Sequence, residues 1–260
     1  MSPQPQHTHH DGPVRRTIAP IRRSDIGWFV GAYAALVGLF YLVGRAILAS
    51  DGIVRADTDA AQWFADRRTR RLNHLTLIGS SLSETVIRIL VTIVLSLVMF
   101  AVWRRFREPM VIILPLILEA MVFITVTYLV GRPRPAVPRL EGSPVDSSFP
   151  SGHAAAAFVY NALLIVVFWH TRKWWIRILA GVVTMGVALA VGISRAYRGM
   201  HHISDVLAGF LLGAMSIAVC WWLVERVLRR NVAPDDGGAP AIDDGETPGA
   251  APQLDLVHRG

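Results

Sequence analysis

Six long runs of mostly apolar residues limit what this chain can fold into. They lie at residues 27–49, 85–103, 109–130, 154–170, 174–193 and 204–227. An α-helix needs about 20 apolar residues to cross the hydrocarbon core of a bilayer, and these runs are close to that length. The composition agrees, since 53% of the residues are hydrophobic and only 17% are charged. The sequence therefore predicts an all-α integral membrane bundle of six transmembrane helices.

The segment at residues 50–84, between the first two runs, is too polar to be a seventh span. It holds an apolar and aromatic stretch at residues 60–64, followed by a cluster of four arginines within residues 67–71. Apolar and basic residues combined in this way are typical of a helix that lies in the plane of the membrane interface. We expect a surface amphipathic helix between transmembrane helices one and two, and a plain loop is the alternative.

The two ends of the chain differ in composition from the apolar runs. Residues 1–24 are rich in Pro, His and Arg, and residues 231–260 are rich in Pro, Gly, Asp and Ala. Neither stretch has the apolar content that offsets the entropy lost when a chain becomes ordered. We therefore predict disordered tails on either side of one membrane domain at residues 25–230.

The basic residues indicate contact with lipid headgroups rather than with nucleic acid. The net charge is +7 and Lys173 is the only lysine, but the arginines flank the apolar runs instead of forming one stripe. One face of the bundle collects eleven basic residues, while the arginines at residues 67–71 and in the motifs make the opposite face basic as well: the eleven are Arg15, Arg16, Arg22, Arg23, Arg104, Arg105, Arg107, Arg172, Lys173, Arg229 and Arg230. Basic residues near helix ends favour the cytoplasm. We expect a multi-pass protein of the cell membrane whose opposite face is extracytoplasmic.

That opposite face carries most of the polar residues that are candidates for binding or catalysis. In a six-helix bundle, the loops after helices three and five share one side of the membrane. The first loop ends in Ser151-Gly152-His153, where helix four begins, and exposed backbone N–H groups at a helix start bind anions. Arg134 and Arg195 supply planar guanidiniums, which suit phosphate oxygens. Together these residues predict a phosphate site.

Two histidines and a carboxylate add reactive groups to this site. His201 and Asp205 are four residues apart at the start of helix six, a spacing that places both on one helix face. A carboxylate bonded to one ring nitrogen leaves the other nitrogen free to attack. His153 is then available to protonate the leaving oxygen. These groups suffice for phosphoryl transfer, and they imply no metal or other cofactor.

The same motifs resemble the type 2 phosphatidic acid phosphatase family, which also includes the vanadium haloperoxidases. The resemblance rests on Gly131–Pro135, Pro150–His153 and Ser194–Asp205, and it extends over residues 27–227. It implies a helical bundle and a metal-independent reaction through a phosphohistidine. It also implies a role for each matching residue: His201 as the nucleophile, Asp205 as its orienting group, His153 as the general acid, and Arg134, Ser151, Gly152 and Arg195 as phosphate-binding residues.

The first motif departs from the family pattern at Thr127. The family usually has a lysine there, seven residues before Arg134, and no lysine is near in this chain. Arg132 and Arg139 are candidates to replace its charge, and Ser194 and Thr127 are further candidates for phosphate contact. His202 adjoins the proposed nucleophile, but the motif spacing favours His201. Two polar residues within the apolar runs, Glu119 and Asn161, are expected to be structural and hydrogen-bonded.

A site at the bilayer edge favours a substrate with its tail in lipid and its phosphate at the surface. We expect a lipid phosphatase that acts on phosphatidic acid, phosphatidylglycerol phosphate or polyprenyl diphosphate, and small single-domain relatives favour the last of these. The alternatives are a lipid phosphotransferase, a transporter or channel, an inactive membrane interaction protein and a haloperoxidase. A transporter would place its polar residues near the bilayer midplane, whereas here they crowd one face.

Overall fold

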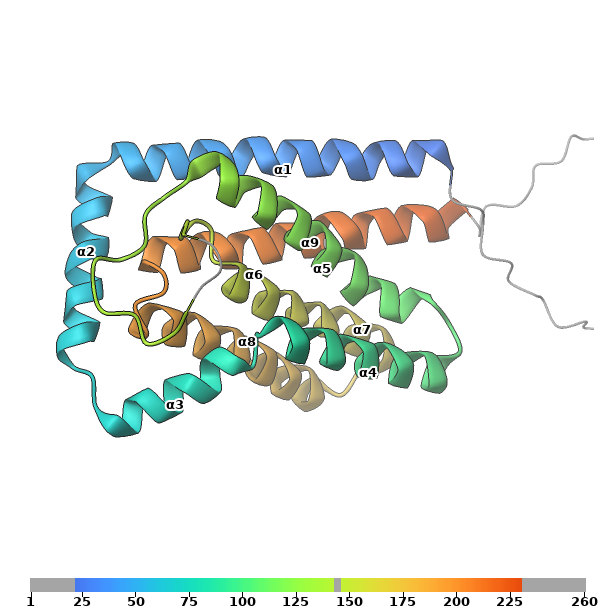
Figure 1. Ribbon diagram of the computed structural model, residues 1–260. Coiled ribbons are helices and arrows are strands. Elements are labelled where there is room, and N and C mark those ends of the chain that lie inside the picture. The colour runs from blue at the N-terminus through green and yellow to red at the C-terminus, as the bar shows by residue number, and fades with distance from the viewer. Residues whose placement is uncertain (1–21, 143–145, 231–260) are drawn as a thin grey trace, which may run out of the picture.

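A computed structural model describes residues 22–142 and 146–230, and these residues form helices and connecting loops (Figure 1). Six helical segments are long and apolar enough to cross a membrane. They are α1 (Arg23–Ala49), α4 (Thr85–Trp103), α5 (Arg107–Val130), the run α6–η1–α7 (Gly152–Val159, Tyr160–Ala162, Leu163–His170), α8 (Trp174–Tyr197) and α9 (Ile203–Arg230). The six-span prediction is thus confirmed. The predicted tails fall almost wholly outside the described residues, except that Arg23 and Ser24 belong to α1.

The segment between α1 and α4 forms two helices, α2 (Asp51–Asp66) and α3 (Arg70–Ser81), where one was expected. The break has a local cause, because the Thr69 hydroxyl accepts a hydrogen bond from Leu72 N at 3.2 Å and so caps a new helix. Figure 1 shows α2 lying across one end of the bundle, at a steep angle to α1. This helix therefore covers the end at which the motif loops meet.

α6 and α9 cross at backbone contact. A Cβ atom added at Gly209 would lie 2.5 Å from Ser151 O, and one added at Gly213 would lie 2.6 Å from Ala155 O. The facing stretch of α6 at residues 154–157 is four alanines. Small residues spaced by four let two helices approach closely within a membrane, where van der Waals packing drives association. This crossing sets the relative position of the two helices whose starts carry the predicted site.

The other end of the bundle brings the start of α1 to the end of α9. The rings of Trp28 and Trp222 meet edge to face, with centroids 5.3 Å apart, and the Arg226 guanidinium lies 5.5 Å from the centroid of each ring. Both described ends of the chain therefore lie at the end of the bundle away from α2 (Figure 1).

Two polar residues inside the bundle behave differently from each other. Asn161, in the short η1 turn, donates to Phe158 O at 2.9 Å and accepts from the Thr184 hydroxyl at 2.9 Å, as expected of a structural residue. Glu119 is 1% exposed, and neither carboxyl oxygen has a hydrogen-bond partner among the described residues. The expected hydrogen bond of Glu119 is therefore not found there.

Candidate active site

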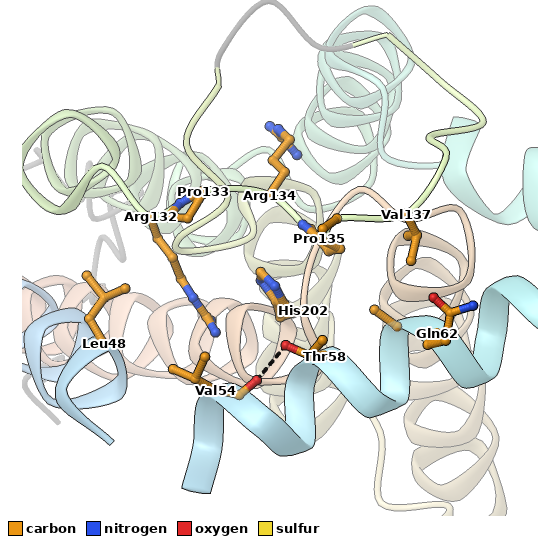
Figure 2. Close-up of a pocket in the computed structure, with 12 residues that line it drawn as sticks. Leu48, Val54, Thr58, Gln62, Arg132, Pro133, Arg134, Pro135, Val137 and His202 are labelled. Atoms are coloured by element: carbon orange, nitrogen blue, oxygen red, sulfur yellow. Dashed lines mark hydrogen bonds between the residues drawn. The ribbon is translucent and has the colours of Figure 1, made fainter. Parts of the chain in front are cut away.

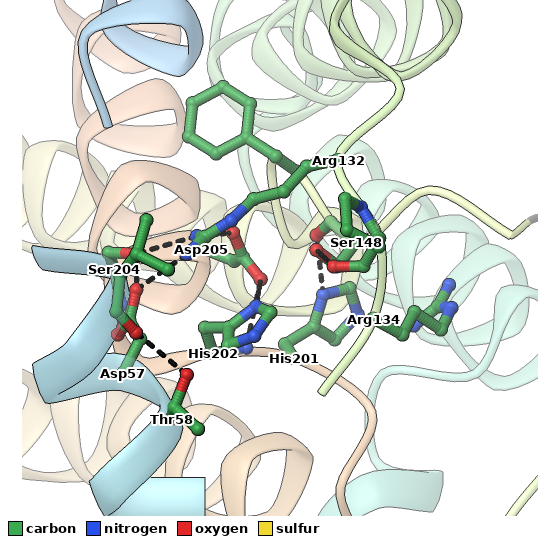
Figure 3. A network of polar contacts seen from close by, with 12 residues as sticks. Asp57, Thr58, Arg132, Arg134, Ser148, His201, His202, Ser204 and Asp205 are labelled. Carbon is green, nitrogen blue, oxygen red and sulfur yellow. Dashed lines mark hydrogen bonds and ion pairs between the residues drawn. The ribbon is translucent and has the colours of Figure 1, made fainter. Parts of the chain in front are cut away.

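Residues 131–142 and 146–151, which follow α5, and the loop between α8 and α9 meet beside α2 (Figure 3). His201 lies in the second of these loops and is 4% exposed. Its Nδ1 lies 2.7 Å from Ser148 O. A carbonyl oxygen can only accept, so Nδ1 carries the ring proton and Nε2 keeps its lone pair. The histidine that the sequence singled out is thus held in the tautomer that a nucleophile needs.

Asp205 does not occupy the place expected of it. α9 begins at Ile203, so His201 precedes the helix, and the four-residue spacing does not put the two side chains on one helix face. The Asp205 carboxylate instead accepts from His202 N at 2.8 Å, from His202 Nδ1 at 3.1 Å and from Arg132 Nη1 at 2.5 Å. The orienting bond to His201 comes from the main chain at Ser148.

The surroundings of His201 keep its ring neutral. Burial, and then the positive charges of Arg195 and Arg134, lower the pKa of His201 well below its ordinary value of 6.5. A protonated imidazole cannot attack phosphorus, because its lone pair is already used. At neutral pH the ring is therefore in its reactive form while two cations remain close enough to attract an anion.

The start of α6 brings the other predicted residues to the same place. Ser151 caps the helix by accepting from Ala154 N at 3.4 Å, and its own N–H donates to Asp205 O at 3.0 Å. Gly152 is buried against the Phe123 ring, which a Cβ atom would meet at 2.9 Å. The carbonyl of His153 accepts from Ser83 at 2.8 Å, while its ring bonds to no other described residue. That ring is free to exchange a proton with a ligand.

The two predicted phosphate-binding arginines already have partners. Arg195 is 5% exposed, and its Nη1 lies 2.5 Å from Glu141 Oε2 and 2.9 Å from the Ser80 hydroxyl. Arg134 is partly buried and donates to Met200 O. Burial, followed by repulsion from Arg139, lowers the pKa of Arg134 below its ordinary value. The charges of Arg134 and Arg195 act on each other, so an anion placed between the two guanidiniums would be favoured.

Arg132 lies in a buried network with Asp57, Ser204 and Asp205 (Figure 3). Its Nη1 donates to Asp205 at 2.5 Å and to the Ser204 hydroxyl at 2.7 Å, and its Nη2 donates to Asp57 at 2.8 Å. With its donors on carboxylates and 2% of its surface exposed, Arg132 is poorly placed to replace the missing lysine. Arg139, the other candidate, has an exposed side chain.

The remaining candidates sit in packing positions. Thr127 is 2% exposed in the last turn of α5, and its hydroxyl donates to Phe149 O at 3.4 Å. It therefore supports the loop from beneath. Ser194 lies where α8 crosses α3, and a Cβ atom added at Gly79 would come within 2.3 Å of its hydroxyl oxygen. Both residues help to shape the site.

Three groups at the site were not foreseen from the sequence: the carboxylates of Asp57 and Glu141 and the carbonyl of Ser148. Glu141 accepts from Arg195 and forms an ion pair with Arg198, whose Nε lies 2.5 Å from Glu141 Oε1, while Asp57 reaches the network from α2. Neither acid belongs to a sequence motif. Every residue has a backbone carbonyl, so the sequence cannot indicate which carbonyl contacts His201. The buried position of Asp57 four residues before the buried Ala61 is the periodicity that indicates an inward face of α2.

A cavity of about 220 Å³ lies between α2 and residues 132–137 (Figure 2). Leu48, Val54 and Ala61 line it together with Pro133 and Pro135, and His202 forms part of its wall. Figure 2 shows the Arg134 side chain pointing away from α2 and the Arg132 side chain pointing toward it, while the other labelled residues of the lining are mostly apolar. This cavity offers space for uncharged atoms next to the proposed phosphate site.

Comparisons with known proteins agree with the motifs. Residues 108–229 match the model of the PAP2 superfamily. Phosphatidylglycerophosphatase B of Bacillus subtilis is 39% identical over 88 residues, which are 32% of this chain and 41% of that protein. The undecaprenyl-diphosphatase of Sulfolobus acidocaldarius is 37% identical over 92 residues, which are 35% of this chain and 36% of that protein. The chain thus spans less than half the length of these two relatives.

A solved structure shares the fold. The transmembrane PAP2-type phosphatidylglycerolphosphate phosphatase of Bacillus subtilis superposes with a TM-score of 0.66 at 22% identity. The superposition covers 73% of this chain and 94% of that structure. The arrangement of helices described above is therefore that of a known transmembrane enzyme fold.

Proposed function

We propose that this chain, whose residues 108–229 match the model of the PAP2 superfamily, is a membrane lipid phosphatase of that superfamily. The observation that carries the proposal is the state of His201. Its Nδ1 faces the Ser148 carbonyl, and burial, followed by the charges of Arg195 and Arg134, lowers the pKa of the ring so that it stays neutral beside two cations. A neutral nucleophile between two cations is what attack on a phosphate requires.

The proposed reaction has two steps. His201 Nε2 attacks phosphorus as the bond to the lipid oxygen breaks, and His153 donates its proton to that oxygen, which leaves as the alcohol or the lipid monophosphate. The product on the protein is a phosphohistidine. A water molecule then attacks phosphorus, His153 takes the water proton, and inorganic phosphate departs. Arg134, Arg195 and the α6 N–H groups at Gly152 and His153 stabilise the charged oxygens.

The position of the site favours a lipid substrate. It lies at one end of a bundle of six helices that are long and apolar enough to cross a membrane, so a phosphate held at the membrane surface can reach it. We propose the extracytoplasmic face, since Arg104, Arg105 and Lys173 lie in loops at the opposite end. The two relatives named above act, by their names, on phosphatidylglycerophosphate and undecaprenyl diphosphate. Polyprenyl diphosphate is our first choice among substrates.

The test is phosphate release by the purified protein from phosphatidic acid, phosphatidylglycerol phosphate and polyprenyl diphosphate, with a chelator present. We expect release that vanadate inhibits. His201→Ala should lower kcat by at least about 10³-fold, because removing a nucleophile removes the whole covalent route. His153→Ala should lower it by about 10²-fold or more. His202→Ala is the matched control, and the mechanism is wrong if this variant loses more activity than His201→Ala.

The same site would support a lipid phosphotransferase, in which an acceptor alcohol replaces water in the second step. Product analysis separates the two reactions, because a transferase moves phosphate to an added lipid while releasing little of it. If the wild-type protein neither releases nor transfers phosphate, the remaining alternative is an inactive membrane protein. The lack of a cationic residue at position 127, which is Thr127, would then explain the missing activity.

A further inference from the structure

Asp57 is a buried carboxylate on α2 that reaches the motif residues from outside the two motif loops. It is 4% exposed. Its Oδ1 accepts from Ser204 N at 3.1 Å, and its Oδ2 accepts from the Ser204 hydroxyl and from Arg132 Nη2 at 2.8 Å. Figure 3 shows Asp57 approaching from α2 while Ser204 and Asp205 approach from α9. Within the described residues, the hydrogen bonds of its carboxylate are therefore with Ser204 at the start of α9 and with Arg132.

The start of α9 needs such a group. Val206 N donates to His202 O at 3.2 Å, which makes His202 the residue that caps the helix. A helix start leaves N–H groups without partners, and Ser, Thr, Asp or Asn at the cap usually accepts from one of them. His202 is not one of these residues. Asp205 accepts from His202 N, as in half of a capping box, and Asp57 of α2 accepts from Ser204 N.

An ion-pair network also connects Asp57 to the motif residues, in addition to its hydrogen bonds with Ser204. Arg132 lies between two carboxylates, donating to Asp57 through Nη2 and to Asp205 through Nη1. Burying a charge costs free energy unless it is paired and hydrogen-bonded. Loss of either acid would leave one end of the buried Arg132 guanidinium without its carboxylate partner. Burial opposes ionisation of Asp57, but the hydrogen bonds from Ser204 and Arg132 outweigh it and lower its pKa below 3.8. Asp57 is thus an anion at neutral pH.

We propose that Asp57 is a positioning residue for the phosphatase reaction, fixing the start of α9 and with it the adjoining His201 ring. This inference rests on the proposed function. It assigns to α2, which lies outside the motif-bearing segment at residues 108–229, a part in holding the nucleophile. A small displacement of a reacting group can cost about 10²-fold in rate, so the position of this helix start matters.

The experiment compares Asp57→Asn and Asp57→Glu with Asp59→Asn, a matched control on the exposed face of the same helix. For each purified, folded protein we would measure kcat and KM for lipid phosphate. Hydrogen–deuterium exchange of the peptide around residues 201–206 would be followed as well. Asp57→Asn should lower kcat by about 10- to 100-fold with KM changed less than about threefold. It should also speed exchange at the start of α9. Asp57→Glu should recover part of kcat, and Asp59→Asn should match the wild type.

Two results would overturn the inference. In the first, Asp57→Asn keeps the wild-type kcat. In the second, kcat falls only in proportion to the amount of folded protein, with unchanged exchange around residues 201–206; Asp57 would then be an ordinary stability residue. Failure of the proposed function looks different, because in that case the wild-type protein itself releases no phosphate from any lipid while the exchange comparison still reports whether Asp57 holds α9.

Discussion

The carbonyl of Ser148 orients the ring of His201, and so the main chain controls the orientation of the proposed nucleophile. A side-chain substitution cannot delete a carbonyl. The tautomer therefore depends on the path of the loop at residues 146–151, which the buried Phe149 and the hydrogen bond from Thr127 hold in place. Residues that look passive in the sequence thus set the reactivity of the histidine.

The lowered pKa of His201 predicts the pH dependence of activity. The neutral ring is the majority form at every pH above that pKa and is lost only as the pH falls through it. The acid limb of kcat/KM that belongs to the nucleophile should therefore lie below pH 6.5. The measurement is the pH profile of kcat/KM for two substrates whose phosphates have different pKa values. An acid limb at the same pH in both profiles belongs to the protein and not to the substrate. A shared limb at or above pH 6.5 would contradict the environment described for His201.

Glu141 should weaken the binding of anions, because its carboxylate already pairs with Arg195. Glu141→Gln keeps a hydrogen-bonding side chain but removes a negative charge from the phosphate site. We expect vanadate to inhibit this variant at about fivefold lower concentration, which corresponds to about 1 kcal/mol of relieved repulsion. Glu84→Gln, a change at an exposed acid, is the control. Weaker inhibition by vanadate would mean that Glu141 organises Arg195 for binding instead of competing for it.

The chemistry of individual residues could be predicted from the motifs, but their contacts could not. His201, His153, Arg134 and Arg195 were chosen from residue type and spacing, and the structure gathers them at one end of the bundle. The pairing of Asp205 was wrong, because the prediction assumed that the helix already includes His201. Contacts such as that of Asp57 with Ser204 join positions 147 residues apart, and no local pattern encodes them.

At the scale of elements, the crossing of α6 and α9 depends on the absence of side chains. Gly213→Ala would place a methyl group 2.6 Å from the backbone oxygen of Ala155, and backbone cannot rotate away as a side chain can. We expect the free energy of unfolding to fall by about 1–3 kcal/mol, measured as a lower midpoint of thermal unfolding in detergent. Gly38→Ala is the control, since nothing lies within 4 Å of its added Cβ. Equal midpoints for the two variants would show that the crossing is looser than described.

The elements themselves follow from hydropathy to within a few residues. Runs of apolar residues near the bilayer thickness are a strong pattern, and all six appear as helices. The division of the surface segment into α2 and α3 was missed because Thr69 is a small local feature within a basic stretch. The η1 turn in the fourth span was missed as well. Asn161 lies in this turn and accepts a hydrogen bond from Thr184 on α8, and a contact between two helices cannot be predicted from the local sequence.

At the scale of the whole molecule, the site and the described chain ends lie at opposite ends of the bundle (Figure 1). With the site outside the cell, a cysteine at Asp59→Cys should react with a membrane-impermeant maleimide on intact cells. One at Arg105→Cys, between α4 and α5, should react only after lysis. The native Cys220 is fully buried and should add little background. The reverse labelling pattern would place the site on the cytoplasmic face.

The backbone contact between α6 and α9 separates what can vary in this protein from what cannot. Ser151 N–H bonds to Asp205 O, and Gly209 and Gly213 bring the two main chains together, so no exchange of side chains elsewhere resets the spacing of the helix starts. The apolar lining of the cavity is different, because Val54 and Ala61 come from α2 and Pro135 and Val137 come from the loop after α5. Under the proposed function, substitutions at these apolar positions change the space next to the site without moving the helix starts that hold the proposed reacting groups.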